Sequence, residues 1–299
     1  MPSVPLPGRI PADGRVLPWT ISRRVLGEGL RRVDDHLVTV DILDGTLTRL
    51  DPRRPGDGRR LLRLDVPLGA VAPVAGQPGA WLAAAGTGVA LIAGAGTIEW
   101  LDRPEDGAPI PMRVNDGCCD AQGRFWFGTM PYDGSAHRGS LYRVERDGSV
   151  VPVLRGLTIP NGPAFSPDGT VMYLADSAQG RIDRYTLDTA TGELRERTVF
   201  VQLPPGAGSP DGMTVDDEGH LWVAVWGAGA VHRYAPDGSL ERVSTLPATQ
   251  PTSPVLYEGR LFVATASHGL DRPAGHDGRV LVTGAGGITA PAATHAVLD

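Results

Sequence analysis

The segment Gly219-His220-Leu221-Trp222-Val223-Ala224 decides the fold, because it recurs in altered form along the whole chain. It is a short apolar run with a residue at its centre that is usually bulky. The same pattern occurs at 36–40, 80–84, 124–128, 171–175 and 260–264. Its central residues, which lie 45, 43, 47, 49 and 40 positions apart, are Val38, Ala83, Trp126, Tyr173, Trp222 and Phe262. A period of about 45 residues is typical of a four-stranded propeller blade.

Most of these units continue with a glycine turn and a second alternating run, as in Gly139-Ser140-Leu141-Tyr142-Arg143-Val144. Six units of about 45 residues account for roughly 270 positions and leave an N-terminal strand to pair with the last unit. The sequence therefore predicts an all-β, six-bladed β-propeller of four-stranded antiparallel blades around a central channel, forming one domain over residues 1–299. A TIM barrel is rejected because helical spacing is not sustained anywhere in the chain.

Composition excludes several classes of function. The 299 residues carry a net charge of −6, which argues against binding of nucleic acid. All 28 basic residues are arginine, so a P-loop lysine and a Schiff-base lysine are both absent. The sequence also contains no G-x-S-x-G, H-E-x-x-H or G-x-G-x-x-G motif.

The cysteine content and the apolar segments indicate the compartment. Cys118 and Cys119 are adjacent and cannot form an unstrained bridge with each other, which fits a reducing environment. The first twenty residues contain no continuous apolar run typical of an export signal. The uncharged stretch Val66–Ile98 contains seven glycines and three prolines, so we expect turn-linked strands rather than a membrane helix. These features predict a cytoplasmic protein without a membrane partner.

Several units begin with a polar segment where the chain would enter the innermost strand. These segments are Gly27-Glu28-Gly29, Arg113-Val114-Asn115-Asp116-Gly117, Pro160-Asn161-Gly162, Pro210-Asp211-Gly212 and Pro251-Thr252-Ser253. Equivalent positions of a ring converge on its axis, where carboxylate and amide oxygens would surround a divalent cation. The two asparagines of the chain both lie in these segments. Taken singly, each segment also fits an ordinary Asn-Gly or Asp-Gly turn.

These segments, together with Gly123-Arg124-Phe125-Trp126-Phe127-Gly128-Thr129-Met130 and Asn161-Gly162-Pro163-Ala164-Phe165-Ser166-Pro167-Asp168-Gly169, give the chain a family resemblance. It resembles the senescence marker protein (regucalcin) and gluconolactonase family of six-bladed propeller hydrolases, over nearly its whole length. The resemblance implies that Glu28, Asn161 and Asp211 hold the metal. It also implies that Arg113 and Asn115 bind substrate oxygens beside it.

The expected chemistry is opening of a small cyclic ester by water. A cation on the axis would polarise the carbonyl and help to generate hydroxide, and Asp211 would take the proton of the water. Calcium, zinc, manganese and magnesium all suit mixed carboxylate and amide oxygens. The fork of Arg113 suits a substrate hydroxyl, a carbonyl or a developing oxyanion, and the alternative is an ion pair with Asp116.

Some positions depart from the family pattern or allow two interpretations. Leu30 replaces the usual proline after Gly29, which predicts an atypical first inner strand. Asp133 is a candidate for an acidic substrate contact that some family members have after the Gly-Thr-Met segment. Trp226 is either a wall of the pocket or part of the core. The two cysteines are expected to be buried apolar residues rather than reactive thiols, and the histidines, including His268, are expected to be surface or strand-end residues.

The leading hypothesis is therefore a divalent-metal-dependent lactonase acting on a sugar lactone or related small cyclic ester. The alternatives are another metal-dependent esterase or phosphotriesterase on the same fold, or a non-catalytic binding propeller. A propeller that forms amine condensation products without metal ranks lower, because it gives no reason for the Asn161 and Asp211 segments.

Overall fold

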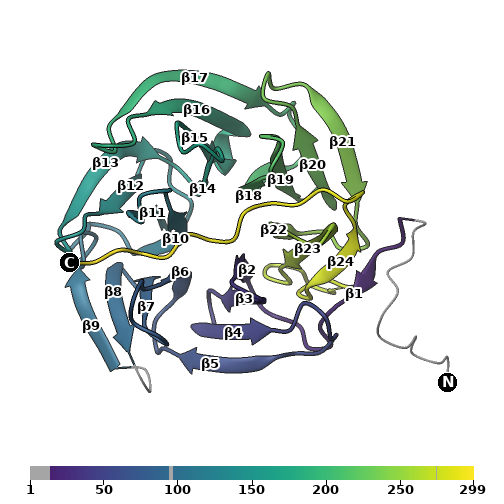
Figure 1. Cartoon of the computed structure of the whole chain (residues 1–299), viewed down its shortest axis with the longest axis horizontal. Coiled ribbons are helices and arrows are strands. Elements are labelled where there is room, and N and C mark those ends of the chain that lie inside the picture. Colours follow the sequence, from purple (N-terminus) through teal and green to yellow (C-terminus); the bar gives the residue numbers. More distant parts are fainter. Residues whose placement is uncertain (1–13, 94–96, 274) are drawn as a thin grey trace.

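A computed structural model describes residues 14–93, 97–273 and 275–299 of the chain. Residues 1–13, on which much of the export-signal prediction rests, lie outside this part. The described chain forms six four-stranded antiparallel sheets arranged in a ring, so the predicted six-bladed β-propeller is confirmed (Figure 1). No helix in the described part is long and apolar enough to cross a membrane.

The first strand of each blade lies next to the central channel, and we call these six the inner strands. They are β2 (Gly27–Val33), β6 (Leu68–Pro73), β10 (Met112–Cys119), β14 (Pro160–Phe165), β18 (Ser209–Val215) and β22 (Pro251–Tyr257). The second strands contain the six runs that revealed the repeat. They are β3 (His36–Asp41), β7 (Trp81–Ala85), β11 (Phe125–Pro131), β15 (Val171–Asp176), β19 (Leu221–Trp226) and β23 (Arg260–Thr265).

The third and fourth strands complete each blade on its outer side. The third strands are β4 (Thr46–Leu50), β8 (Gly88–Ala93), β12 (Gly139–Val144), β16 (Arg181–Leu187), β20 (Ala230–Tyr234) and β24 (Leu281–Gly284). The outer strands are β5 (Arg59–Arg63), β9 (Thr97–Asp102), β13 (Val150–Leu157), β17 (Leu194–Gln202), β21 (Leu240–Thr245) and β1 (Leu17–Pro18). Because β1 pairs with β24, the N-terminal segment supplies the outer strand of the sixth blade.

Packing between neighbouring blades depends on the bulky residues of the second strands. Trp126, Trp222 and Phe262 are all fully buried. This burial explains why the repeat is visible in the sequence, since the centre of each second strand lies between sheets. The uncharged stretch Val66–Ile98 supplies β6, β7, β8 and the start of β9, as expected for turn-linked strands.

Each inner strand has an irregular register with its second strand near its beginning. In five blades the shift falls on a polar segment, between Glu28 and Arg31, Val114 and Gly117, Asn161 and Ala164, Pro210 and Met213, or Pro251 and Ser253. A bulge of this kind bends a strand and redirects side chains. The first inner strand has the same irregularity as the others despite Leu30, so the expectation that it would be atypical is wrong.

The C-terminal segment, residues 285–299, closes the channel at the end where the inner strands finish, which we call the base. Figure 1 shows it as the yellow trace across the middle of the ring. Ala293 N–H donates to Arg32 O at 2.7 Å, near the end of β2, and Val297 N–H donates to Gly123 O at 3.0 Å, in the turn after β10. The opposite end of the channel, where the inner strands begin, is its mouth.

Candidate functional site

A cavity of about 330 Å³ occupies the mouth of the channel. Five predicted site residues, which come from four different inner strands, line it together: Glu28, Arg113, Asn115, Asn161 and Asp211. All five side chains are buried, with at most 9% of each residue exposed. The structure therefore brings together every residue that the sequence assigned to the site. A smaller cavity of about 150 Å³ lies at the base, beneath the C-terminal segment.

Glu28 and Asp211 form a buried pair of carboxyl groups in hydrogen-bonding contact. Burial raises the pKa of Glu28 to about 8, and the neighbouring Asp116 carboxylate adds to this effect. Burial also raises the pKa of Asp211 well above its usual range, with Glu28 as the next cause. Among the residues that the structure describes, neither carboxyl group forms an ion pair with a basic side chain. The pair thus consists of two buried acidic groups that hold their protons more tightly than usual and have no ion-pair partner among the described residues.

A chain of side-chain hydrogen bonds links the other site residues. Arg113 Nη1 donates to Asn115 Oδ1 at 2.8 Å, and Asn115 Nδ2 donates to Asn161 Oδ1 at 2.8 Å. Asn161 Nδ2 donates to Ser177 Oγ at 2.8 Å. Both amides are therefore fixed in orientation, with Asn161 Oδ1 retaining one lone pair for a further partner.

Asp116 does not pair with Arg113, so the ion pair considered as an alternative for Arg113 is not formed. Asp116 instead accepts from Arg31 Nη2 at 3.2 Å and from the Gly162 N–H at 3.0 Å. Arg31 Nη1 also approaches Ser253 Oγ at 3.3 Å. These contacts join inner strands β2, β10, β14 and β22 across the channel, below the carboxyl pair.

Glu28, Asn161 and Asp211 fit a divalent cation. The two carboxyl groups lie close enough for their charges to oppose each other, and neither forms an ion pair with a described residue. Carboxylate and amide oxygens are the donors that calcium and magnesium prefer, and they are accepted by manganese and zinc. A cation held by this pair would offset the cost of burying the two charges, which is the main cause of the raised pKa values, and would relieve the repulsion that adds to it.

The remaining sequence candidates have clear positions. Asp133 is exposed, and its Oδ1 accepts from the Ser135 N–H at 2.9 Å, so it does not line the cavity. Trp226 both lines the cavity and packs against the core around Leu26. Cys118 donates its thiol to Pro163 O at 3.0 Å, and burial raises its pKa to about 12. Burial likewise raises the pKa of Cys119, so both thiols are protonated, with Cys119 buried and Cys118 partly buried.

Sequence reasoning missed a second row of residues around the mouth. These residues end or follow the second strands of five blades: Ile42, Tyr132, Ser177, Trp226 and His268. In an antiparallel blade, the end of the second strand lies beside the start of the first. The signal available in the sequence was thus position, two to four residues beyond each apolar run, rather than residue type. Of this row, only Trp226 was singled out as a possible wall of the pocket.

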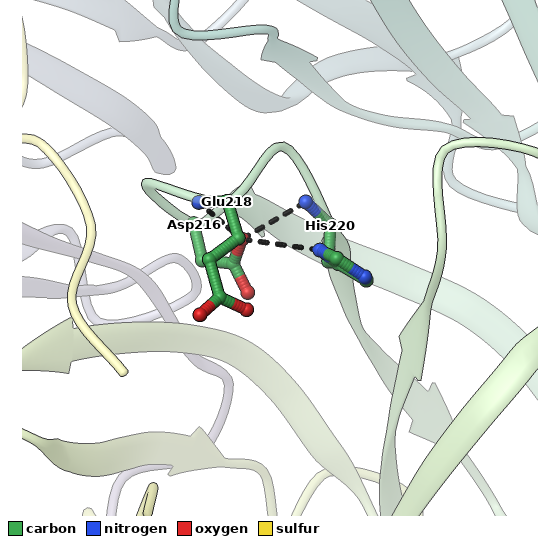
Figure 2. A group of neighbouring side chains, drawn as sticks. All are labelled: Asp216, Glu218 and His220. Carbon is green, nitrogen blue, oxygen red and sulfur yellow. Dashed lines mark hydrogen bonds and ion pairs between the residues drawn. The ribbon is translucent and has the colours of Figure 1, made fainter. Parts of the chain in front are cut away.

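A second acidic group lies in the turn between β18 and β19, at the base end of the fifth blade. It consists of Asp216, Glu218 and His220, which we call the turn group (Figure 2). Asp216 Oδ1 accepts from the N–H groups of Glu218 at 3.0 Å and His220 at 2.9 Å. Its Oδ2 accepts from Trp222 Nε1 and Arg233 Nε, each at 2.9 Å.

The turn group is a structural anchor rather than a metal centre. Arg233 contacts the carboxylates of both Asp216 and Glu218, so each acidic residue of the group already has a basic partner. The same guanidinium also pairs with Glu241 at 2.8 Å. The third blade repeats the arrangement, since Asp120 accepts from Trp126 Nε1 at 3.0 Å and from Arg124 Nε at 2.6 Å. A repeated Asp–Trp contact joins each turn to the core of its blade.

Comparison with known proteins agrees with this geometry. Residues 26–267 match the family model described as the SMP-30/Gluconolactonase/LRE-like region. A regucalcin from Xenopus laevis is 32% identical over 245 residues, which cover 79% of this chain and 80% of that protein. A pentonolactonase from Haloferax volcanii is 39% identical over 169 residues, 55% of this chain.

The pentonolactonase match covers 57% of that protein, and the chain spans little more than half the length of several such curated relatives. Among solved structures, a regucalcin from Agrobacterium tumefaciens, titled a calcium-binding protein, superposes with a TM-score of 0.83. It is 30% identical, and the alignment covers 92% of this chain and 94% of that one.

Proposed function

We propose that this chain, which belongs to the SMP-30/gluconolactonase/LRE-like family, is an enzyme that hydrolyses sugar lactones with the help of one divalent metal ion. One observation carries the proposal. Glu28 and Asp211 are buried side by side without an ion pair to any described residue, and they line the same cavity as Asn161 and Arg113.

When bound by Glu28, Asn161 and Asp211, a divalent ion would supply a Lewis acid for the lactone carbonyl and for water. Asp211 accepts a proton from the attacking water, whose oxygen bonds to the carbonyl carbon. The bond from this carbon to the ring oxygen then breaks. The proton passes from Asp211 to the ring oxygen, and the product is the open hydroxy acid.

Arg113 and Asn115 have different parts in this proposal. Asn115 uses Nδ2 to donate to Pro160 O at 2.9 Å and to Asn161 Oδ1 at 2.8 Å, while its Oδ1 accepts from Arg113. Its main effect is therefore to position Arg113 and Asn161, and one Oδ1 lone pair is left for a substrate hydroxyl. Arg113 binds substrate oxygens directly with the donors that face the cavity.

The test is acid release from a panel of aldonolactones, an aryl ester and a phosphotriester, measured with and without chelator. We expect lactone hydrolysis that chelation abolishes and that added divalent metal restores. Asp211→Asn should lower kcat by about a thousandfold, as removal of an essential proton acceptor does. Lactone hydrolysis indifferent to both changes would refute the mechanism, and selective cleavage of the phosphotriester would identify the other hydrolase.

The identity of the metal and the location of the protein are finer parts of the same proposal. Calcium is the first candidate, because the donors are hard oxygens and the similar Agrobacterium protein is titled calcium-binding. Magnesium, manganese and zinc belong in the same titration. A cytoplasmic location stays a prediction that accords with two free cysteines.

A further inference from the structure

The charged groups that line the cavity are few, and they do not balance once an ion is bound. Glu28, Asp211 and Arg113 are the charged side chains among the described residues of the lining, and Tyr132 and His268 are its other titratable groups. The charges of the two carboxylates equal that of one divalent ion. Arg113 then remains as an uncompensated cation inside the cavity.

The carboxylates whose charges act on Arg113 are those of Glu28 and Asp211, which a bound ion would occupy. Arg113 forms no ion pair with any residue that the structure describes. Its guanidinium donates twice through Nη1, to Val114 O and to Asn115 Oδ1, each at 2.8 Å. Its Nε and Nη2 make no hydrogen bond to any residue that the structure describes, although Arg113 is only 9% exposed. A buried cation without a partner is costly, so a site that keeps one is suited to an anion supplied from outside.

Neither Asp116 nor Asp133 supplies that anion. Asp116 is committed to Arg31 below the carboxyl pair, at 3.2 Å. Asp133 turns away and accepts from the Ser135 N–H. Tyr132, half-exposed and neutral in its usual form, lines this side of the cavity instead. Burial lowers the pKa of Arg113, and the Tyr132 phenol opposes that effect, which indicates that the two side chains are near each other.

We propose that the substrate of this site is an anionic lactone, one that carries a carboxylate or sulfonate group in addition to its ring. The planar guanidinium of Arg113, with two donors unused, recognises that group while the ring carbonyl reaches the ion held by Glu28, Asn161 and Asp211. A cavity of about 330 Å³ is in the range that holds a small organic molecule. The inference rests on the proposed lactonase function and adds the charge of the substrate to it.

Two lactones that share a ring test the charge directly. D-Glucaro-1,4-lactone and D-glucono-1,4-lactone have the same ring and stereocentres, and they differ in a carboxylate or a hydroxymethyl group at carbon 6. With metal supplied, we expect kcat/KM to be at least tenfold higher for the glucarolactone. Added salt should reduce this advantage and leave hydrolysis of the neutral lactone unchanged.

The outcomes distinguish the two claims. A neutral lactone hydrolysed as well as the anionic one, or better, would overturn the anionic substrate and leave the lactonase function intact. Hydrolysis of neither lactone, while other esters are cleaved, would overturn both.

A matched pair of variants separates charge from size. Tyr132→Glu would place a carboxylate beside Arg113, whereas Tyr132→Gln has the same size and no charge. We expect the ratio of the two kcat/KM values to fall at least fivefold in Tyr132→Glu relative to Tyr132→Gln. Because the readout is a ratio within each variant, a general loss of activity cancels. Equal ratios in the two variants would contradict the role given to charge.

Discussion

Asp211 and Asp216 stand five residues apart, one in β18 and the other directly after it, and both are buried. Asp216 is surrounded by donors, since two N–H groups, an indole and a guanidinium all reach its carboxylate. Asp211 faces a second carboxyl group instead. The number of acidic residues thus does not identify a metal centre. What distinguishes the pair at the mouth is that Glu28 and Asp211 form no ion pair with any residue that the structure describes.

Measuring metal affinity is the most direct test of the difference between the two sites. Glu28→Gln and Glu218→Gln make the same chemical change in two places, the first in the central pair (Glu28 and Asp211) and the second in the turn group. Calorimetric titration with calcium should show affinity weakened by about a hundredfold or more in Glu28→Gln, because a ligand and its charge are lost. Glu218→Gln should bind as the unaltered protein does, with one ion per chain. Loss of binding in Glu218→Gln alone would place the ion in the turn group.

Stability should change in opposite directions when the two aspartates are neutralised. Asp216→Asn removes a buried acceptor from Trp222 and Arg233, so we expect the free energy of unfolding to fall by about 3 kcal/mol. Asp211→Asn relieves repulsion with Glu28 and should stabilise the metal-free protein at about pH 8. Denaturant unfolding in the presence of chelator measures both. Destabilisation of similar size in both variants would show that the central pair is also structurally matched.

The fold was predictable because the repeat lies in buried residues, whose size is set by the packing between neighbouring sheets. Trp126, Trp222 and Phe262 fill equivalent places between sheets, so they recur at the period of a blade. The convergence of Glu28, Asn161 and Asp211 could be predicted from the same period, because the polar segments occupy the same position in each repeat. In a ring of blades, equivalent positions of the inner strands lie close together at the axis.

Other parts of the site depend on choices that a period does not encode. Asp116 could pair with Arg113 or with Arg31, and the bulge in β10 directs it toward Arg31 across the channel. The residues after the second strands share a position but no chemical type, so Tyr132 and His268 were not identified. The acidic residues of the turn group lie closer together in the sequence than Glu28 and Asp211 do. Only the structure shows that Arg233 contacts them and gives them a structural role.

The pH dependence of stability sharpens the comparison further. Burial raises the pKa of Glu28 to about 8 from an ordinary value of 4.5, and the pKa of Asp211 also rises. The folded metal-free protein therefore holds more protons than the unfolded chain between these values, and its stability falls as pH rises through that window. Between about pH 5 and 8, we expect the Tm of the chelated protein to fall by on the order of 5 °C. Saturating metal should remove most of this slope, and a slope unchanged by metal would mean that other groups cause it.

Substitution of Asp133 should have the smallest effect, and it tests whether the site extends to the loop after β11. Its carboxylate is exposed and accepts from the Ser135 N–H, outside the cavity that Tyr132 lines. Asp133→Asn keeps the size and one acceptor of the side chain, so we expect kcat/KM for both test lactones within about twofold and stability within about 0.5 kcal/mol. A tenfold loss confined to one lactone would mean that this loop turns its acidic group inward when substrate binds. The negative charge that Arg113 lacks would then come from the protein, and unmatched charge at the mouth would be limited to Glu28 and Asp211.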